Sequence, residues 1–582
     1  MTAITGTQID PMTLSVVHNR LVHITREMSQ VIMRCSQNYP SSQLFDFGTA
    51  LFDARGRLLA HGASLPGNAF TGNGQVEAVL KRFGDRIYPG DEFIANDPYV
   101  GGGTHLGCWG FVSPIFYGDE LLFFVHTKQH QMDTSGAYPG GYFPGAYDIH
   151  AEGLCMPPIK FTERGQPNEG VRDFLYNNVR FREDVKIDNQ SQFAAHRIAA
   201  DRVARMIERY GKETMLTYVE AIIERMEKFV RSEIEKLPDG TYYGQAACDD
   251  DGSRHGIPIW VRARVIVEGD EVTVDLTESD KQVAFVNSPL ENTKARVYTG
   301  VFFCLDTSMA RYHNQGSCNP VKFITEPGTV VHPVYPATVG ACPIFVGTQI
   351  RDAVIQALGQ AAPEKCTSGW SKQMGFDDWG LDRRRVPFWT AQFCHGGGGA
   401  SCGVDGWPYV MITGLRKGSA EVTESRYPWR VLCIEMTKDT EGAGQWRGGP
   451  GTHAEWLSEG EGRHQLVTGN SDGCWTETYA LAGGQLPSQK YNLTQIVRKN
   501  GEAETIATKR GPYDLGQGDR FVIYAAGGSG WGNPRERDPE MVRNDVVNEL
   551  VSLERARQVY GVAIVPDALE IDWEETERLR SP

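Results

Sequence analysis

The sequence predicts an α+β fold: a mixed, multi-domain chain with several β-rich layers, an inserted helical hairpin and short C-terminal helices. Its 582 residues exceed the roughly 250–300 that a single hydrophobic core supports. Stretches with apolar residues at helical spacing alternate with short stretches of strand-like alternation. Glycine is abundant, with 65 residues against a usual share of about 7%. Its clusters indicate either tight turns of a β-rich protein or shaped loops around a site.

Changes in residue composition and in apolar periodicity along the chain divide it into five predicted units. The first carries a candidate metal site. No repeat, low-complexity tract or flexible linker separates the units. They are an N-terminal α/β domain at 1–188, a helical hairpin at 189–237, a β-rich domain at 238–345, a glycine-rich mixed α/β domain at 346–535 and C-terminal helices at 536–582.

The first unit opens with a predicted helix over 10–35, where apolar residues recur near a helical period behind a cap at Asp10. Residues 44–60 predict a β-hairpin, because two apolar runs flank a turn. Residues 120–126 predict a strongly apolar strand. Residues 131–150 are rich in glycine, proline and aromatic residues and predict a long loop, which inside a compact domain is usually functional.

The later units also contain stretches with helical spacing of apolar residues and stretches with strand-like alternation. Residues 189–237 predict two helices, because apolar residues follow a three-to-four spacing that is broken at Gly211. We expect this pair to serve structure or subunit contact, with no chemistry. The other predicted elements are strands at 260–267, 272–276 and 519–526, and two short helices that begin at Asp538 and Ser552.

Composition excludes several classes of protein. The formal net charge of −15 argues against a general nucleic-acid binder. No apolar run approaches the roughly 18 residues of a membrane span, and the first residues lack a signal-peptide pattern, so we expect no membrane partner and a cytoplasmic location. The 12 cysteines form no C-x-x-C pair, which argues against a zinc knuckle or a dithiol motif. No phosphate-loop sequence is present, so this chain is not expected to bind ATP.

Histidine gathers in one stretch of the first unit. Of the 14 histidines, four fall between positions 105 and 150: His105, His126, His130 and His150. Aspartates share the stretch, and Asp133 follows His130 by three residues. Imidazole and carboxylate groups together are ligands of Zn²⁺, Mn²⁺ or Fe²⁺, which polarise carbonyls and activate water. Any one histidine could instead be a hydrogen-bonded core residue, and His126 could simply face the core at the end of an apolar strand.

Ordered blocks along the chain carry a more specific signal. They are LFDFGTALFD at 44–53, NDPYVGGGTHL at 96–106, HQMD at 130–133, EGLCMPP at 152–158, ESRYP at 424–428, GAGQWRGG at 442–449 and GWGNPRERDP at 530–539. In these blocks the chain resembles the hydantoinase B/oxoprolinase family nearly from end to end. The block at 96–106 is the most specific of them.

The resemblance implies a role as the metal-bearing catalytic B-type subunit of a hetero-oligomer. A separate ATP-binding A-type subunit would activate the carbonyl of a cyclic amide, such as a hydantoin, 5-oxoproline or a lactam, for hydrolysis. The alternative is a subunit of a biotin-independent, ATP-dependent ketone carboxylase of the acetone or acetophenone type, and a further alternative is a non-catalytic scaffold. The implied cofactor is a divalent metal, Zn or Mn. The implied catalytic residues are His105, His130 and Asp133, and the implied metal ligands are Asp46, His105, His130, Asp133 and His150.

The chain departs from the family pattern at three places. Where the family has proline and aspartate after the first motif histidine and leucine, this chain has Gly107-Cys108. The second histidine of the later motif is Gln131, and His150 adds an imidazole two residues after Asp148. Whether His126, Asp148 or His150 joins the site therefore stays open at this point. The aromatic loop at 138–147 suits a flat or apolar substrate.

Overall fold

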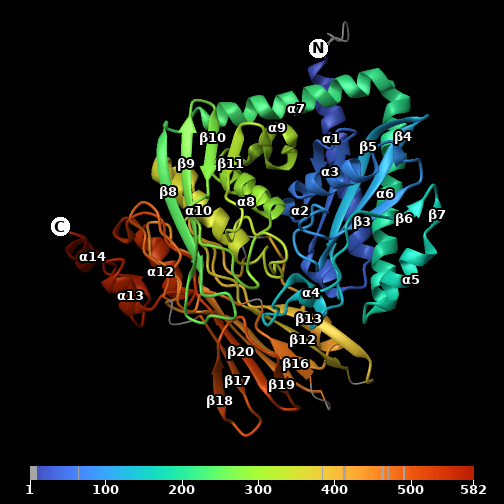
Figure 1. Cartoon of the computed structure of the whole chain (residues 1–582). Coiled ribbons are helices and arrows are strands. Elements are labelled where there is room, and N and C mark those ends of the chain that lie inside the picture. The colour runs from blue at the N-terminus through green and yellow to red at the C-terminus, as the bar shows by residue number, and fades with distance from the viewer. Residues whose placement is uncertain are drawn as a thin grey trace.

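The computed structural model describes residues 9–62, 64–382, 384–410, 414–460, 464–469, 471–488 and 492–581. Within these ranges the chain forms a mixed α+β architecture of antiparallel and mixed sheets covered by helices (Figure 1). The first two sheets follow one another along the chain, whereas the strands of the next two alternate in sequence. The candidate site lies in the first sheet.

The N-terminal sheet has seven strands in the order β2-β1-β5-β4-β3-β6-β7, and all its neighbours are antiparallel. The expected hairpin at 44–60 and the expected strand at 120–126 are confirmed as β1, β2 and β5. The strands are β1 (Phe47–Asp53), β2 (Leu58–His61), β3 (Glu92–Ala95), β4 (Cys108–Tyr117), β5 (Glu120–His130), β6 (Ile159–Glu163) and β7 (Gln166–Pro167).

Helices cover both faces of this sheet. On β5, Phe123 and Val125 belong to one core with α1 (Pro11–Cys35) and α6 (Arg182–Tyr210), whereas Phe124 packs into another core with α3 (Gly72–Phe83). Because strand side chains alternate between faces, even-numbered residues of β5 lie on the α3 side. Short helix α2 (Pro66–Phe70) precedes α3 and contacts β1 and β5. Asp10 caps α1, as expected, through its side chain and the Thr13 amide.

Gly211 separates α6 from α7 (Lys212–Ile234), as the sequence predicts. The two helices do not lie along one another: α6 packs against α1, and α7 runs across the top of the molecule toward the second sheet (Figure 1). That sheet has the order β11-β10-β9-β8 and confirms the expected strands at 260–267 and 272–276. Its elements are β8 (Gly240–Cys248), β9 (Ile259–Glu268), β10 (Glu271–Asp275) and β11 (Val321–Ile324), with α8 (Leu290–Phe302) and α10 (Val346–Ala361) packed beside them.

Two further sheets form the lower part of the molecule in Figure 1. The first contains β13-β12-β16-β19, namely Pro387–Phe393, Gly375–Leu381, His464–Val467 and Tyr513–Leu515. The second contains β14-β15-β20-β17-β18, namely Trp429–Thr437, Gly451–Ser458, Arg520–Ala525, Leu493–Val497 and Ala503–Ile506. Strand β20 confirms the strand expected at 519–526.

The C-terminal segment forms its own small core. The two expected helices are present as α12 (Pro539–Val547) and α13 (Leu553–Gln558). The expectation of only two was incomplete, because α14 (Trp573–Arg580) follows them behind a cap at Asp572. Between α13 and α14 lies a two-stranded sheet of β21 (Ile564–Val565) and β22 (Glu570–Ile571). The remaining short helices are α4 (Ile149–Glu152), α5 (Glu169–Asn177), α9 (Gln315–Cys318) and α11 (Ala420–Arg426).

The triple glycine after β3 shapes the loop that leads to the site. Gly102 has φ +68°, and a Cβ there would lie 2.1 Å from a backbone atom of Gly74 at the start of α3. A Cβ at Gly103 would lie 2.0 Å from the carbonyl oxygen of Asn96. Only glycine permits so close an approach of two backbones. The loop therefore presses against α3 and carries Thr104 and His105 into the interior.

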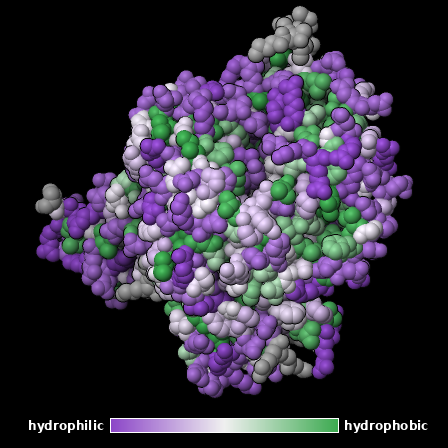
Figure 2. Space-filling view, viewed as in Figure 1, coloured by the Kyte–Doolittle hydropathy of each residue, from purple (hydrophilic) through white to green (hydrophobic). Residues whose placement is uncertain are grey.

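Hydrophilic side chains predominate on the face of the molecule shown in Figure 2, and apolar residues are scattered among them. Within the described part of the chain, every helix is too short or too polar to cross a membrane.

Candidate metal centre

Three neighbouring strands bring the candidate site together at one end of the N-terminal sheet. Strands β1 and β4 flank β5 and run antiparallel to it, so their first residues lie beside its last residue. Cys108, the first residue of β4, is the register partner of His130, the last residue of β5. Asp46 directly precedes β1, and its carbonyl accepts a hydrogen bond of 3.1 Å from the His130 amide. The antiparallel register therefore gathers residues from a stretch of the sequence that runs from position 46 to position 130.

His105, Cys108 and His130 form the core of the site. One ligand atom from each of the three side chains lies within 4.8 Å of the other two, and all three residues are buried. The Cys108 sulfur is 3.0 Å from His105 Nε2 and 3.7 Å from His130 Nδ1. Ligand atoms on a tetrahedral zinc with bonds of about 2.0–2.3 Å are about 3.5 Å apart. The donor set and its spacing fit a divalent metal.

The second nitrogen of each imidazole does not take part in the cluster. In the part of the chain that the structure describes, His105 Nδ1 and His130 Nε2 are buried and make no hydrogen bond. They are not the nitrogens next to the Cys108 sulfur, so an ion bound at the cluster would not pair them. The case for a metal therefore depends on the three donor atoms and their spacing.

Aromatic side chains enclose the two imidazoles. The ring of Tyr142 stacks on His130 with centroids 5.3 Å apart and lies 5.6 Å from His105, while Trp389 lies 5.9 Å from His130. Burial lowers the pKa of His130 to about 3. Burial also holds the pKa of His105 well below its ordinary value, and the nearby His130 adds to this effect. Both imidazoles are therefore neutral at neutral pH, the form that binds metals. Burial, and next the Asp46 carboxylate, raise the pKa of the Cys108 thiol.

A small cavity adjoins the cluster. Its volume is about 30 Å³, enough for two or three water-sized groups. Asp46, Thr104, His105, Cys108 and Arg296 are among its lining residues. Burial raises the pKa of Asp46 to about 6, against the opposing effects of Asn68, Lys128 and Arg296. The Asp46 carboxylate lies on the cavity wall but is not among the atoms of the three-residue cluster.

The structure places the other predicted site residues elsewhere. Asp133 is buried in an ion pair of 2.9 Å with Arg180 and also accepts the Arg180 amide proton, so its carboxylate is already used. His150 is exposed on α4 and contacts the Tyr335 hydroxyl at 2.9 Å. Neither residue belongs to the cluster. The structure therefore does not bring Asp133 and His150 to the same ion as His105 and His130, because each of these two side chains contacts another partner.

The two remaining open candidates also have structural partners. His126 lies on the same face of β5 as His130 but hydrogen-bonds to Gln75 at 2.7 Å beneath α3. Asp148 caps α4 by accepting the amide protons of His150 and Ala151. Both residues thus serve local structure.

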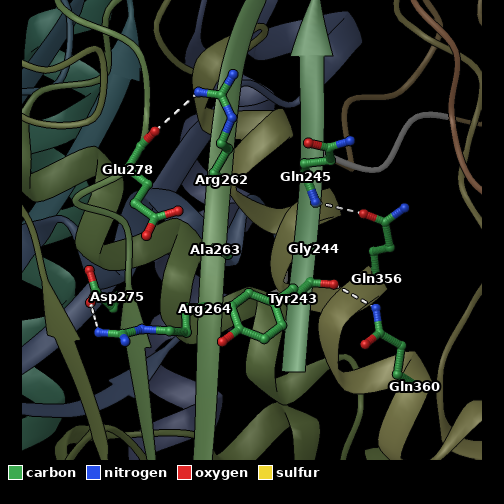
Figure 3. Close-up of a pocket in the computed structure, with 10 residues that line it drawn as sticks. All are labelled: Tyr243, Gly244, Gln245, Arg262, Ala263, Arg264, Asp275, Glu278, Gln356 and Gln360. Carbon is green, nitrogen blue, oxygen red and sulfur yellow. Dashed lines mark hydrogen bonds and ion pairs between the residues drawn. The ribbon is translucent and has the colours of Figure 1, made fainter. Parts of the chain in front are cut away.

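Two other features of the described chain resemble sites at first sight. Cys433, His453 and Glu455 form a second cluster of metal-ligating residues, half-buried on β14 and β15. A larger cavity of about 400 Å³ lies beside β8, β9 and α10 (Figure 3). No histidine or cysteine lines that cavity, and its arginines Arg262 and Arg264 pair with Asp280 and Asp275. The cluster around Cys108 differs from both, because three fully buried ligand residues adjoin a cavity.

The hydantoinase B/oxoprolinase family model matches residues 10–534. The chain belongs to the hydantoinase B/oxoprolinase family. It is 31% identical over 569 residues to the beta subunit of the caprolactamase of Pseudomonas jessenii, across 96% of each chain. It is also 31% identical over 594 residues to the B subunit of a putative D-/L-hydantoinase of Pseudomonas sp. (strain NS671), across 98% of each chain.

Two solved structures share the fold of this chain. The crystal structure of the ATP-dependent caprolactamase from Pseudomonas jessenii superimposes with a TM-score of 0.88 at 29% identity, over 99% of this chain and 100% of that one. A nucleotide-free acetone carboxylase structure superimposes with a TM-score of 0.87 at 17% identity, over 98% of this chain and 82% of that one. The second likeness concerns the fold alone.

Two residues of this hydantoinase B-type site were missed by sequence reasoning. Cys108 occupies the position of the acidic residue in the family motif, and its place three positions after a motif histidine was the available signal. Arg296 lies on α8, about 190 positions further along the chain, and no local pattern points to it. Only the packing of α8 against the N-terminal layers brings it to the cavity.

Proposed function

We propose that this chain is the metal-bearing B-type subunit of an ATP-dependent complex that hydrolyses a cyclic amide. The observation that carries the proposal is the buried cluster of His105, Cys108 and His130 beside a cavity. Neutral imidazoles and a sulfur ligand favour Zn²⁺ over Mn²⁺ among the two expected metals. A bound divalent metal would polarise the amide carbonyl and lower the pKa of a water molecule.

The residues of this chain have distinct tasks in that reaction. His105, Cys108 and His130 hold the metal. The Asp46 carboxylate lies on the cavity wall and, with a pKa of about 6, is suited to accept a proton from the attacking water near neutral pH. Tyr142 packs against both imidazoles and keeps bulk water from them. Asp133 and His150 have no part in this scheme, because Arg180 and Tyr335 engage them.

The proposed partner is an A-type subunit that binds ATP. The sequence contains no phosphate-loop motif. The named relatives are the beta and B subunits of their enzymes, which supports a hetero-oligomer. The cyclic substrate would therefore be activated on the partner and hydrolysed on this chain.

A ketone carboxylase subunit is the second candidate function. The chain is 23% identical over 623 residues to the acetophenone carboxylase delta subunit of Aromatoleum aromaticum, across 99% of this chain. In that case the same ligands would hold the metal that stabilises an enolate for attack on CO₂. The aromatic side chains of Tyr142 and Trp389 beside the cluster suit such a flat, apolar substrate.

One experiment separates these functions. The chain is purified with its co-expressed partner, its metal content is measured by elemental analysis, and ATP-dependent turnover is assayed on hydantoin, 5-oxoproline and caprolactam and, with bicarbonate, on acetone and acetophenone. We expect about one zinc per chain and ring opening without bicarbonate. Carbon–carbon bond formation that requires bicarbonate would favour the carboxylase instead. Full turnover by a metal-free complex would contradict both enzymes.

A further inference from the structure

The guanidinium of Arg296 faces the cavity beside the cluster, and among the described residues no carboxylate lies within ion-pair distance of it. Arg296 is 6% exposed, and its side chain makes one hydrogen bond, from Nε to Asn292 Oδ1 at 3.3 Å. Among the residues that the structure describes, its two terminal nitrogens have neither a hydrogen-bond nor an ion-pair partner, and the side chain lines the cavity. Gly67 leaves room for this fork, because a Cβ there would lie 3.1 Å from Nη1. The two terminal nitrogens are not among the fully enclosed polar atoms of the described residues, so the fork is open to a ligand in the cavity.

A second buried cation lies behind the same wall. Lys128 on β5 is fully buried, and its ammonium group donates to the hydroxyls of Thr71 at 3.1 Å and Thr104 at 2.7 Å. Thr104 also lines the cavity. Because the Thr104 oxygen accepts from Lys128, its own proton is free to donate toward the cavity. Lys128 thus supplies charge and fixes the orientation of a hydroxyl donor.

The charges around the cavity do not balance. Asp46 is the carboxylate that acts on both cations, and it offsets only one of them. Glu152, the nearby acid of α4, is held by the amides of Val339 and Gly340 and does not offset the other cation. A divalent metal on the cluster would increase the excess of positive charge.

We propose that Arg296 and Thr104, with Lys128 behind them, form a subsite for an oxyanion group of the substrate. The cavity of about 30 Å³ accommodates a group of a few atoms, not a whole ring. A guanidinium fork binds carboxylate and phosphoryl oxygens with two parallel hydrogen bonds. This inference rests on the proposed function, and it adds that the substrate carries a negative charge when it reaches the metal centre.

Two sources supply such a group. One is a phosphoryl group carried by the activated carbonyl, as the ATP requirement named for the caprolactamase relative suggests. The other is a carboxylate that belongs to the ring substrate itself. A neutral ring would leave the guanidinium buried and unpaired, and sites built for a polar group reject analogues that lack it. Arg296 would therefore discriminate charged from uncharged substrates.

Calorimetric titration of the zinc-loaded full chain tests the subsite. Inorganic phosphate and acetate are titrated separately into the wild type, Arg296→Lys, Arg296→Gln and Lys294→Gln. The last variant is the matched control, because Lys294 lies on the same helix and pairs with Glu291 outside the cavity. We expect the wild type and the control to bind equally, Arg296→Lys to bind about tenfold more weakly through loss of the fork, and Arg296→Gln to bind about 100-fold more weakly.

Each outcome of the titration either identifies the bound group or contradicts the subsite. Tighter binding of phosphate than of acetate identifies a phosphoryl group, and the reverse identifies a carboxylate. Equal binding by the wild type and Arg296→Lys, or no binding of either anion by the wild type at millimolar concentration, overturns the proposal. If Arg296→Gln does not fold, the comparison of the wild type with Arg296→Lys still tests the subsite. The rise in Tm that phosphate or acetate causes in each protein is a second measure of binding. Metal content, measured in parallel, separates failure of the subsite from failure of the metal centre.

Discussion

Two clusters in this chain contain similar ligand types but differ in their surroundings. The first, His105 with Cys108 and His130, is fully buried and adjoins a cavity. The second, Cys433 with His453 and Glu455, lies on an open sheet face, where the His453 and Glu455 side chains are each 19% exposed.

Charged and aromatic neighbours surround the second cluster. Glu455 pairs with Arg520 at 2.9 Å and with His453 at 3.2 Å, and the His453 ring stacks on Tyr524 with centroids 4.3 Å apart. The first cluster has no charged partner of this kind and adjoins a cavity that Arg296 lines. Ligand chemistry alone therefore does not mark a site. Full burial next to a cavity distinguishes the first cluster from the second.

The largest expected effect comes from His130→Ala. Removing one of three ligands should lower turnover of the complex by more than about 100-fold, the upper range for groups that merely support a ligand. His453→Ala is the matched control and should leave turnover unchanged. The measurement is ATP-dependent ring opening together with zinc content. Equal losses of turnover and zinc in the two variants would show that the two clusters do not differ in function.

The burial around the first cluster predicts a pH effect on stability. Asp188 accepts hydrogen bonds from Ser36 and Gln37, next to Asn38, which donates to the His130 carbonyl. Burial raises the pKa of Asp188 from 3.8 to about 6 in the folded chain. Between these two pH values the folded chain binds more protons than the unfolded chain, so the free energy of unfolding falls as the pH rises.

Asp188→Asn should remove this dependence. From pH 4 to pH 7 the wild type should lose about 3 kcal/mol relative to the variant, since one pKa unit corresponds to about 1.4 kcal/mol. Urea unfolding at several pH values measures the difference. Parallel pH profiles for the two proteins would show that this carboxyl does not titrate with folding.

A smaller effect is expected from Gly107→Ala. A Cβ at position 107 would lie 2.7 Å from His130 Cε1 and 2.9 Å from the Gly140 carbonyl. Such overpacking typically destabilises a protein by about 1–3 kcal/mol, and here it would also displace an imidazole of the site. Gly170→Ala is the control, because the nearest atom to a Cβ there is 3.8 Å away. Thermal unfolding and zinc affinity measure both effects, and unchanged zinc affinity in Gly107→Ala would count against the assigned ligands.

Cys108→Asp should produce the smallest change at the site. An aspartate keeps an anionic ligand but replaces sulfur by oxygen, which Mn²⁺ tolerates better than sulfur. We expect the preference for zinc over manganese to fall by about tenfold, within the range known for altered metal surroundings. Competitive metal titration of the purified chain measures it, with Cys433→Ser as the control. An unaltered preference would show that the sulfur does not bind the metal.

Much of the fold could be predicted from local patterns. The helix over 10–35, the hairpin at 44–60 and the strands of the second sheet depend on apolar periodicity and turn residues, which act over a few positions. The third C-terminal helix was missed because its residues are mostly charged and carry little apolar signal. In the site, His105 and His130 were predicted from their clustering and motif positions. Cys108 was seen only as a departure from the family pattern.

The sequence by itself determined the family, the α+β class and the histidines of the candidate centre, because these depend on the order and spacing of nearby residues. Only the tertiary structure decided which side chains meet. The antiparallel register of β1, β5 and β4 places Asp46, Cys108 and His130 at one end of a sheet, and the packing of α8 brings Arg296 to them. Asp133, despite its ideal spacing, turns to Arg180 instead. Contacts between distant segments depend on register and packing, which no local pattern of residues records.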